Sequence, residues 1–231
     1  PRPELEQDAR LRLTPVGRGV VPGGQPLVVR WDVGSIVLPE GVRVEWSRDG
    51  GAEWLMAGAV PAAKGELAWD VPCEDVSACL VRLRAATEDG REIVAGPGSS
   101  FMIDCSPPKV RKVGVAPVVG GETALDVEID SGDASGLATT AVWMRLDATE
   151  PWRRLAESKV RLVPGGGGGR VELDLAALPE ASYQLWVQAT DGVGNSAPEP
   201  DANTVPAASF RLDRTPPAIA VDAGPGQWVE G

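Results

Sequence analysis

The side chains available for chemistry in this chain are serines, cysteines and carboxylates, because its 231 residues include no histidine. Histidine is the commonest general base in enzymes and a very common metal ligand. Its absence excludes a Ser-His-Asp triad, and Ser99-Ser100 also lacks the G-x-S-x-G sequence of a nucleophile elbow. The 33 acidic residues make chance carboxylate pairs common, so no pair by itself indicates glycoside hydrolysis. We therefore predict no enzyme activity, no catalytic residue and no cofactor.

Metal and phosphate sites are predicted to be absent for similar reasons. Asp130, Asp133 and Asp191 fall in predicted loops at one end of the second half of the chain, where their oxygens could converge on calcium. Such residues also cap their own turns, and the spacing lacks the dense acidic loop and terminal Glu of a dedicated site. We predict no metal, with calcium near these three residues left open. The glycine run within Val160 to Gly169 has no following Lys-Ser/Thr, so it predicts a hairpin tip.

Composition narrows the class of protein further. The formal charge of −11 and a pI near 4.6 oppose binding to nucleic acids or anionic membranes, which clustered Lys and Arg must neutralise. No run of 18 or more apolar residues occurs, so we expect any membrane anchor to lie outside this segment. The chain has 28 Gly and 21 Pro but is 43% hydrophobic, which favours many short strands around packed cores.

A short motif that occurs twice sets the domain organisation. Residues 101–108 read F-M-I-D-C-S-P-P and residues 210–217 read F-R-L-D-R-T-P-P. Each time a strand-like end runs into an Asp, a hydroxyl residue and two prolines, which stop a strand and begin a stiff spacer. The two Asp residues are 109 positions apart, about the size of one small domain. We predict domains at 1–104 and 109–213, a linker at 105–108, and a linker with the start of a truncated third repeat at 214–231.

Apolar residues alternate with polar ones in matching stretches of both repeats, the period of a half-buried strand. Leu11 and Leu13 before Pro15 predict an edge strand A. Inward positions in strands B, C, E, F and G of the first repeat are Leu27, Val29, Trp31; Val42, Val44, Trp46; Leu67, Trp69, Val71; Val81, Leu83, Ala85; Phe101 and Ile103. Those in strands B, E and F of the second are Leu125, Val127, Ile129; Val171, Leu173, Leu175; Tyr183, Leu185, Val187 and Ala189. The pattern predicts two all-β sandwiches.

The segment between strands C and C′ of the first repeat resembles an Asp-box hairpin, S-x-D-x-G-x-T-W. It supplies Ser47, Asp49, Gly51 and Trp54, with Glu53 in place of Thr. The Asp can accept turn amides, the Gly takes a positive φ, and the Trp packs under the hairpin. In sialidases this motif is a structural turn that carries no catalysis. We interpret it as an architectural turn.

The turn sequences of the second repeat resemble tandem bacterial immunoglobulin-like or fibronectin type III-like repeats. These are D-S-G-D-A-S-G-L from Asp130, A-T-D-G-V-G-N from Ala189 and the closing L-D-R-T-P-P. The resemblance implies two consecutive sandwiches of that type, acting as a non-catalytic spacer or adhesion module of a larger secreted or cell-surface bacterial protein, with a periplasmic location also open. Its partners would be neighbouring domains and a protein or glycan. The alternative is an accessory carbohydrate-binding or substrate-positioning region of a secreted hydrolase.

The start of strand F carries a structural hypothesis in each repeat. In such sandwiches a Tyr there bonds back to the E to F corner, and Tyr183 fits this role. Cys79 occupies the matching position of the first repeat, so we predict a disulfide between Cys73 and Cys79 in place of the tyrosine. A bond between Cys79 and Cys105 ranks second, and three reduced thiols are the alternative for a cytosolic protein.

Trp143 and Trp186 define a possible binding patch. Strand F sends Gln184, Trp186 and Gln188 to its outer face. In strand C of the second repeat, we expect Val142, Met144 and Leu146 to face the core, which places Trp143 on the outer face beside Trp186. This pair could simply stabilise the sheet. It could also form a contact patch for a domain, a partner protein or a sugar ring.

Overall fold

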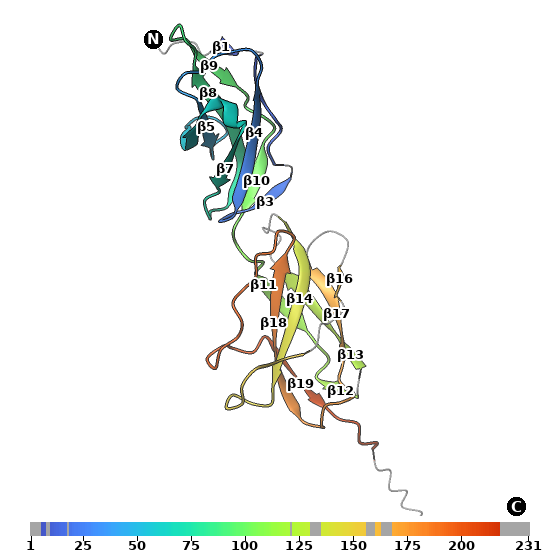
Figure 1. Cartoon of the computed structure of the whole chain (residues 1–231). Helices are drawn as coiled ribbons and strands as arrows, with labels where there is room; N and C mark the ends of the chain where they lie inside the picture. Colours follow the sequence, from blue (N-terminus) through green and yellow to red (C-terminus); the bar gives the residue numbers. More distant parts are fainter. Residues whose placement is uncertain are drawn as a thin grey trace, which may run out of the picture.

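The computed structural model describes residues 6–7, 10–17, 19–120, 122–129, 135–155, 160–162 and 168–217. In these ranges the strands form two sandwiches that follow one another along the chain (Figure 1). The first contains β1 to β10 and the second contains β11 to β19. The predicted all-β class with two consecutive sandwiches is confirmed.

The first sandwich packs a sheet of order β2-β4-β7 against a larger sheet of order β1-β9-β8-β10-β3, in which β5 lies beside β8 and β6 beside β5. A 3-10 turn, η1, precedes β7. The elements are β1 (Glu6–Gln7), β2 (Leu11–Leu13), β3 (Val20–Pro22), β4 (Pro26–Val33), β5 (Val42–Ser47), β6 (Leu55–Val60), η1 (Ala62–Lys64), β7 (Glu66–Asp70), β8 (Val76–Ala86), β9 (Glu92–Ala95) and β10 (Phe101–Asp104).

The second sandwich packs a sheet of order β11-β13-β17-β16 against one of order β12-β19-β18-β14-β15. Strands β16 and β17 are antiparallel, which confirms the predicted hairpin, while its tip at 163–167 lies outside the described residues. The strands are β11 (Val110–Gly114), β12 (Val118–Val119), β13 (Glu122–Ile129), β14 (Leu137–Arg145), β15 (Arg153–Arg154), β16 (Val160–Leu162), β17 (Gly168–Asp174), β18 (Ser182–Asp191) and β19 (Ala208–Leu212).

Strand A is divided between the two sheets in both sandwiches. In the first, β2 pairs antiparallel with β4, whereas β3 pairs parallel with β10 of the opposite sheet. In the second, β11 pairs antiparallel with β13, and β12 pairs parallel with β19 of the opposite sheet. Pro15 and Pro117 lie between the two pieces, where a residue without an amide donor interrupts the ladder. The repeated division shows that the two halves share one immunoglobulin-like architecture.

Each sandwich has its own apolar core. The first core contains the predicted inward faces of strands B, C, E, F and G, with the Trp46 and Trp69 rings 5.4 Å apart at its centre. Leu27 and Leu67 pack against it from partly exposed positions. The second core contains Val127 and the predicted residues of strands E and F, while the side chains of Leu125 and Ile129 lie outside the described set. Burial between separate pairs of sheets is the main stabilising term for each sandwich.

The register of strand C in the second sandwich is confirmed in part. Val142 and Met144 of β14 are buried, and Trp143 lies directly opposite Trp186 of β18 on the outer face. Leu146 was expected in the core but is exposed. The strand ends at Arg145, so the alternation that would have turned Leu146 inward stops one residue earlier.

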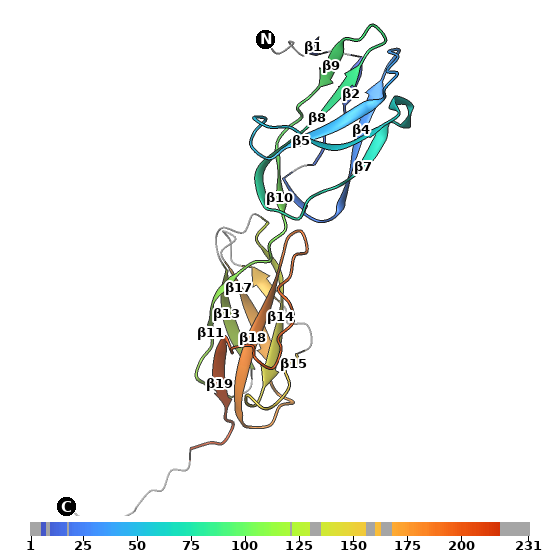
Figure 2. The ribbon, with the colours of Figure 1, turned by 90° about the vertical axis from the view of Figure 1, so that its left-hand side faces the viewer.

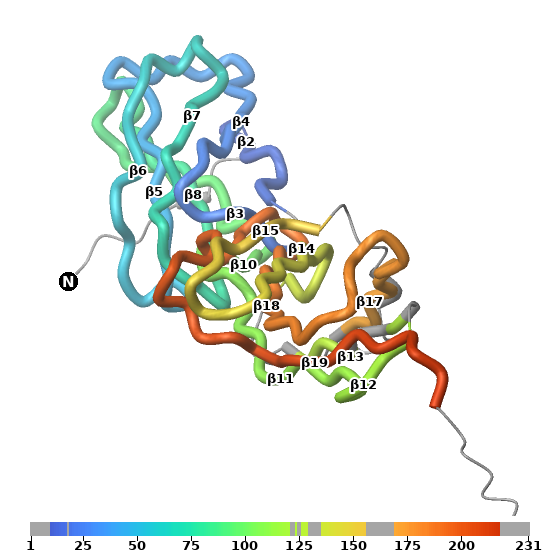
Figure 3. The backbone as a smooth tube through the Cα atoms, turned by 90° about the horizontal axis from the view of Figure 1, so that it is seen from below, coloured from blue at the N-terminus to red at the C-terminus, as the bar shows by residue number. Residues whose placement is uncertain are grey.

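The two sandwiches are arranged end to end. Strands β1 and β9 lie at one end of the molecule and β12 and β19 at the other, with β10 leading into β11 between them (Figures 1 and 2). Viewed from below, the second sandwich overlaps the first only in part, so the two are not stacked on a single axis (Figure 3). No described helix is long and apolar enough to cross a bilayer.

Candidate functional site at the interdomain joints

The first joint, residues 104–108, begins where β10 ends. The carbonyl of Asp104 accepts the amide of Gly23 from the end of β3 at 2.8 Å, which fixes the last residue of the strand. Its Oδ1 accepts the amide of Ser106 at 3.3 Å, so the Asp caps the turn that leads into the two prolines. The backbone direction of the linker is therefore set before it leaves the first sandwich.

A carboxylate from the E to F loop of the first sandwich holds the linker in place. Asp75 accepts the amide of Cys105 on Oδ1 at 2.8 Å and the hydroxyl of Ser106 on Oδ2 at 2.6 Å. The hydroxyl donor, followed by the amide, holds the pKa of Asp75 below its usual value. Asp75 thus clamps two consecutive linker residues to the domain that precedes them.

A disulfide between Cys73 and Cys105 adds a covalent clamp at the same place, with the two Cα atoms 5.3 Å apart. The predicted Cys73–Cys79 bond is therefore wrong, and so is the second choice, Cys79–Cys105. The E to F loop passes beside the end of strand G, which brings residues distant in sequence together. Cys79 is a free thiol buried in the core beside Val81, and burial raises its pKa to about 12.

The second sandwich reaches back to the first joint through its F to G turn. The side-chain amide of Asn195 donates to the Asp104 carbonyl at 3.2 Å and to Asp104 Oδ1 at 3.4 Å. The same amide donates to Asp191 Oδ2 at 2.8 Å, and Asp191 Oδ1 accepts the amides of Val193 and Asn195. Asp191 thus shapes a turn that presents Asn195 to the preceding domain.

Asp191 of this turn is one of the three candidate calcium ligands. The oxygens of Asp191 accept hydrogen bonds from its own turn. Asp130 and Asp133 lie outside the described residues. Over the described part of the chain, no group of three or more Asp, Glu or Cys side chains is placed to hold a metal ion.

The second joint, residues 213–217, repeats the first with different side chains. Asp213 Oδ1 accepts the amide of Thr215 at 3.0 Å, as Asp104 does for Ser106. Glu180 takes the part of Asp75, because it accepts the amide of Arg214 at 2.7 Å and the hydroxyl of Thr215 at 3.0 Å. Both joints are therefore held by a carboxylate from the E to F loop.

Arg214 stands where the first joint has Cys105. Its guanidinium donates to three carbonyls of the E to F loop, those of Leu175 at 2.6 Å, Leu178 at 2.9 Å and Ala176 at 3.3 Å. The flat fork of an arginine suits several acceptors at once. Hydrogen bonds thus tie the second joint to the same loop that a disulfide ties in the first.

The segment interpreted as an architectural turn lies between β5 and β6 of the first sandwich. Ser47 Oγ accepts the amide of Gly51 at 2.8 Å, Asp49 accepts the amide of Glu53 at 3.0 Å, and Gly51 has a φ of 99°. Trp54 lies beneath the turn, where a Cβ on Gly51 would lie 3.4 Å from its ring. The motif closes the β5–β6 hairpin.

The tyrosine of the second sandwich also occupies its expected position. Tyr183 Oη donates to the carbonyl of Pro179 at 2.8 Å, and its ring packs on Phe210 with centroids 5.6 Å apart. The bond holds the E to F loop that also supplies Glu180 and the carbonyls bound by Arg214. Strand F is thereby connected to the second joint.

Trp143 and Trp186 are half-buried on the outer face of β14 and β18. The neighbouring Arg145 is buried, lies 4.3 Å from the ring of Trp152, and donates to the carbonyls of Ala202 and Thr204. Arg145 therefore holds residues 202–204, which precede β19, against this face.

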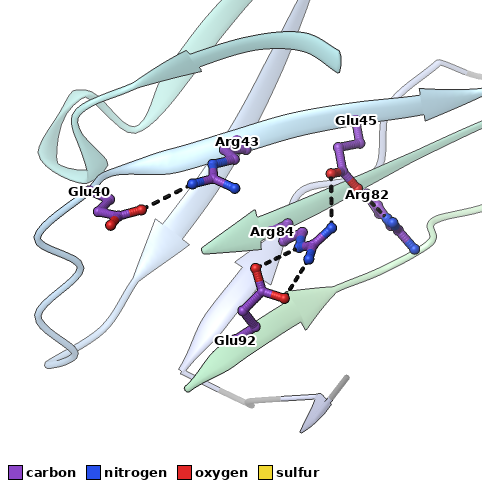
Figure 4. A network of polar contacts seen from close by, with 6 residues as sticks. All are labelled: Glu40, Arg43, Glu45, Arg82, Arg84 and Glu92. Atoms are coloured by element: carbon purple, nitrogen blue, oxygen red, sulfur yellow. Dashed lines mark hydrogen bonds and ion pairs between the residues drawn. The ribbon is translucent and has the colours of Figure 1, made fainter. Parts of the chain in front are cut away.

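Charged side chains cover the corresponding face of the first sandwich (Figure 4). Arg82 lies 2.6 Å from Glu45 and stacks over Trp54, with its guanidinium carbon 4.0 Å from the ring centre. Arg84 contacts Glu45 at 3.7 Å and also pairs with Glu92. This network links the outer faces of β5, β8 and β9.

Asp75, Glu180 and Asn195 are the joint residues that sequence reasoning missed. The repeated D-x-[S/T]-P-P motif locates both linkers, but it says nothing about which loop residues bind them. A usable signal was present, since both E to F loops carry a carboxylate shortly before strand F, at Asp75 and Glu180. Asn195 is the last residue of the quoted A-T-D-G-V-G-N sequence, which predicted a turn without a partner.

Comparisons with known proteins identify no family. No protein-family model and no curated protein matches the chain. Among solved structures, a titin fragment has a TM-score of 0.47 and 15% identity and covers 80% of this chain. The FN1–FN3 domains of chicken CNTN1 have a TM-score of 0.36 and 14% identity and cover 90% of this chain. A bacterial ice-binding adhesin has a TM-score of 0.37 and 14% identity and covers 81% of this chain.

The chain spans 61%, 65% and 60% of the lengths of these three structures, in that order. Because all three TM-scores are below 0.5, the fold assignment rests on the strand order of this chain. That order is of the immunoglobulin-like and fibronectin type III-like kind.

Proposed function

We propose that this segment is a non-catalytic spacer of a larger secreted or cell-surface protein, in which it holds neighbouring domains at a defined distance and angle. Its units are the sandwiches predicted at 1–104 and 109–213. The observation that carries the proposal is the first joint, whose residues are bound to both sandwiches at once. Asp75 and Cys73 hold the linker from one side, and Asn195 contacts Asp104 from the other. Domains joined by an unsupported linker would reorient freely.

The disulfide supports the proposed location. Stable disulfides form in secreted, periplasmic and cell-surface proteins and are rare where thiols are kept reduced. The Cys73–Cys105 bond lies at the joint, so an oxidising compartment would also favour the restrained linker. A net charge of −11 fits an extracellular spacer that does not bind nucleic acid.

The tryptophans favour the spacer over an accessory carbohydrate-binding region. A flat sugar-binding platform needs exposed aromatic rings, and none of the described tryptophans is exposed. Trp31, Trp46 and Trp69 are buried in the first core. The half-buried ones are Trp54, Trp143, Trp152 and Trp186. The pair Trp143 and Trp186 is the surface on which the alternative would depend.

The spacer hypothesis is tested by measuring how freely the sandwiches reorient. Spin labels on unnatural keto amino acids, one in each sandwich, leave the three cysteines intact. We expect one narrow distance distribution by double electron–electron resonance. Asn195→Ala should broaden it because Asp104 loses its contact with the second sandwich, whereas Asn203→Ala, at an exposed loop position, should leave it unchanged. A distribution as broad as that of freely tethered domains in the unsubstituted chain would contradict the proposal.

A further inference from the structure

We propose that Asp213 is the docking point for a third β-sandwich, which binds the second joint as the second sandwich binds the first. The inference rests on the proposed spacer function, because it requires a domain after Pro217. It adds the kind of partner and the residue that receives it.

Asp104 and Asp213 are equivalent in structure as well as in sequence. Asp104 is the last residue of β10 and Asp213 directly follows β19, and each accepts on Oδ1 the amide of the residue two positions later. Each is followed by one residue, a hydroxyl residue and two prolines. A domain that began directly after Pro217 would stand at the same covalent distance from Asp213 as the second sandwich does from Asp104.

The two joints differ in how much of this surface is covered. Asp104 is 3% exposed and Pro108 is buried, with Asn195 of the next sandwich against the Asp. The side chain of Asp213 is 34% exposed, and Pro217 is exposed. Asp213 Oδ2 lies 3.7 Å from Arg211 Nε, which belongs to the same sandwich. The second joint presents to solvent the groups that the first joint buries.

The partner's chemistry follows from the turn that makes the first contact. The F to G turn of the second sandwich spans five residues, closed by the Asp191 amide donating to the Asn195 carbonyl at 3.1 Å. The first sandwich has the same turn, closed by Thr87 and Arg91 at 2.9 Å. The fifth residue is Asn in one and Arg in the other, and both side chains are hydrogen-bond donors. The partner is therefore a β-sandwich whose F to G turn ends in a donor side chain.

A three-sandwich chain tests this directly. Residues 218–231 are replaced by a second copy of residues 109–217, and spin-label pairs are placed across each joint in separate samples. We expect the distance distribution across the second joint to be as narrow as that across the first. Asp213→Ala should remove the narrow peak for the second joint only, and Asn195→Asp in the appended copy should do the same by opposing two carboxylates.

The first joint is the internal reference for this experiment. Glu128→Ala in the middle sandwich, which removes an exposed carboxylate, should change neither distribution. Thermal unfolding of the Asp213→Ala chain checks that the second sandwich still folds. A narrow first joint with a broad second joint, or a second joint unaffected by Asp213→Ala, overturns the inference and leaves the spacer proposal standing. A broad first joint would instead contradict the spacer proposal.

Discussion

The two joints use the same carboxylate support and different clamps. Asp75 and Glu180 each accept an amide and a hydroxyl from the linker that follows their own sandwich. The first joint then adds a covalent bond through Cys105, whereas the second adds three hydrogen bonds from Arg214. A disulfide stabilises chiefly by restricting the unfolded chain, and hydrogen bonds stabilise only the folded one. Two unrelated interactions thus bind the equivalent linker residue to the E to F loop of its own sandwich.

Removing the disulfide should have the largest effect on the comparison. The double substitution Cys73→Ser with Cys105→Ser opens a loop with a sequence separation of 32 residues. We expect the free energy of unfolding of the first sandwich to fall by roughly 3 to 4 kcal/mol. Chemical denaturation followed by tryptophan fluorescence would measure it. The unfolding transition of the second sandwich, with its separate core, should not move. An unchanged transition of the first sandwich would show that the hydrogen bonds of Asp75 hold the linker without the disulfide.

Removing Arg214 should have a smaller effect, confined to the second sandwich. Arg214→Ala loses the bonds to the carbonyls of the E to F loop, and we expect a loss of about 1 kcal/mol, because these bonds lie near solvent. Arg214→Lys keeps the charge but not the planar fork, so it should recover only part of the loss. Full recovery with Lys would mean that charge, rather than the hydrogen bonds, supports this joint. Thermal unfolding of the two variants distinguishes these outcomes.

The smallest effect expected is a loss of stability at the first joint as the pH falls. The pKa of Asp75 is lowered by the Ser106 hydroxyl and the Cys105 amide. Its stabilising contribution is therefore complete above the unfolded pKa and is lost as the pH falls through the folded pKa. Asp75→Asn should weaken the first joint at neutral pH and make its stability less sensitive to acid than that of the unsubstituted chain. The difference between their denaturation midpoints from pH 7 to about pH 2 measures this effect. Parallel curves for the two proteins would assign the acid sensitivity to other carboxylates.

Local pattern alone was enough to predict both sandwiches. A period of two assigned Val42, Val44 and Trp46 to a core, because successive side chains in a strand point to opposite faces. Turn chemistry identified the hairpin of Asp49 and Gly51 for a similar local reason. The alternating pattern did not reveal that β14 ends at Arg145, because the end of a strand depends on the pairing with its neighbouring strands.

Only the tertiary structure decided which residues hold the joints. Cys73 and Cys79 are close in sequence, yet Cys79 points into the core and Cys73 meets Cys105 across the end of the sandwich. Asn195 reaches Asp104 across 91 residues of sequence. A pairing of this kind depends on how loops from different strands converge at one end of a sandwich. The sequence determined that two sandwiches follow one another, and the folding of each E to F loop beside strand G determined how the residues after each sandwich are held.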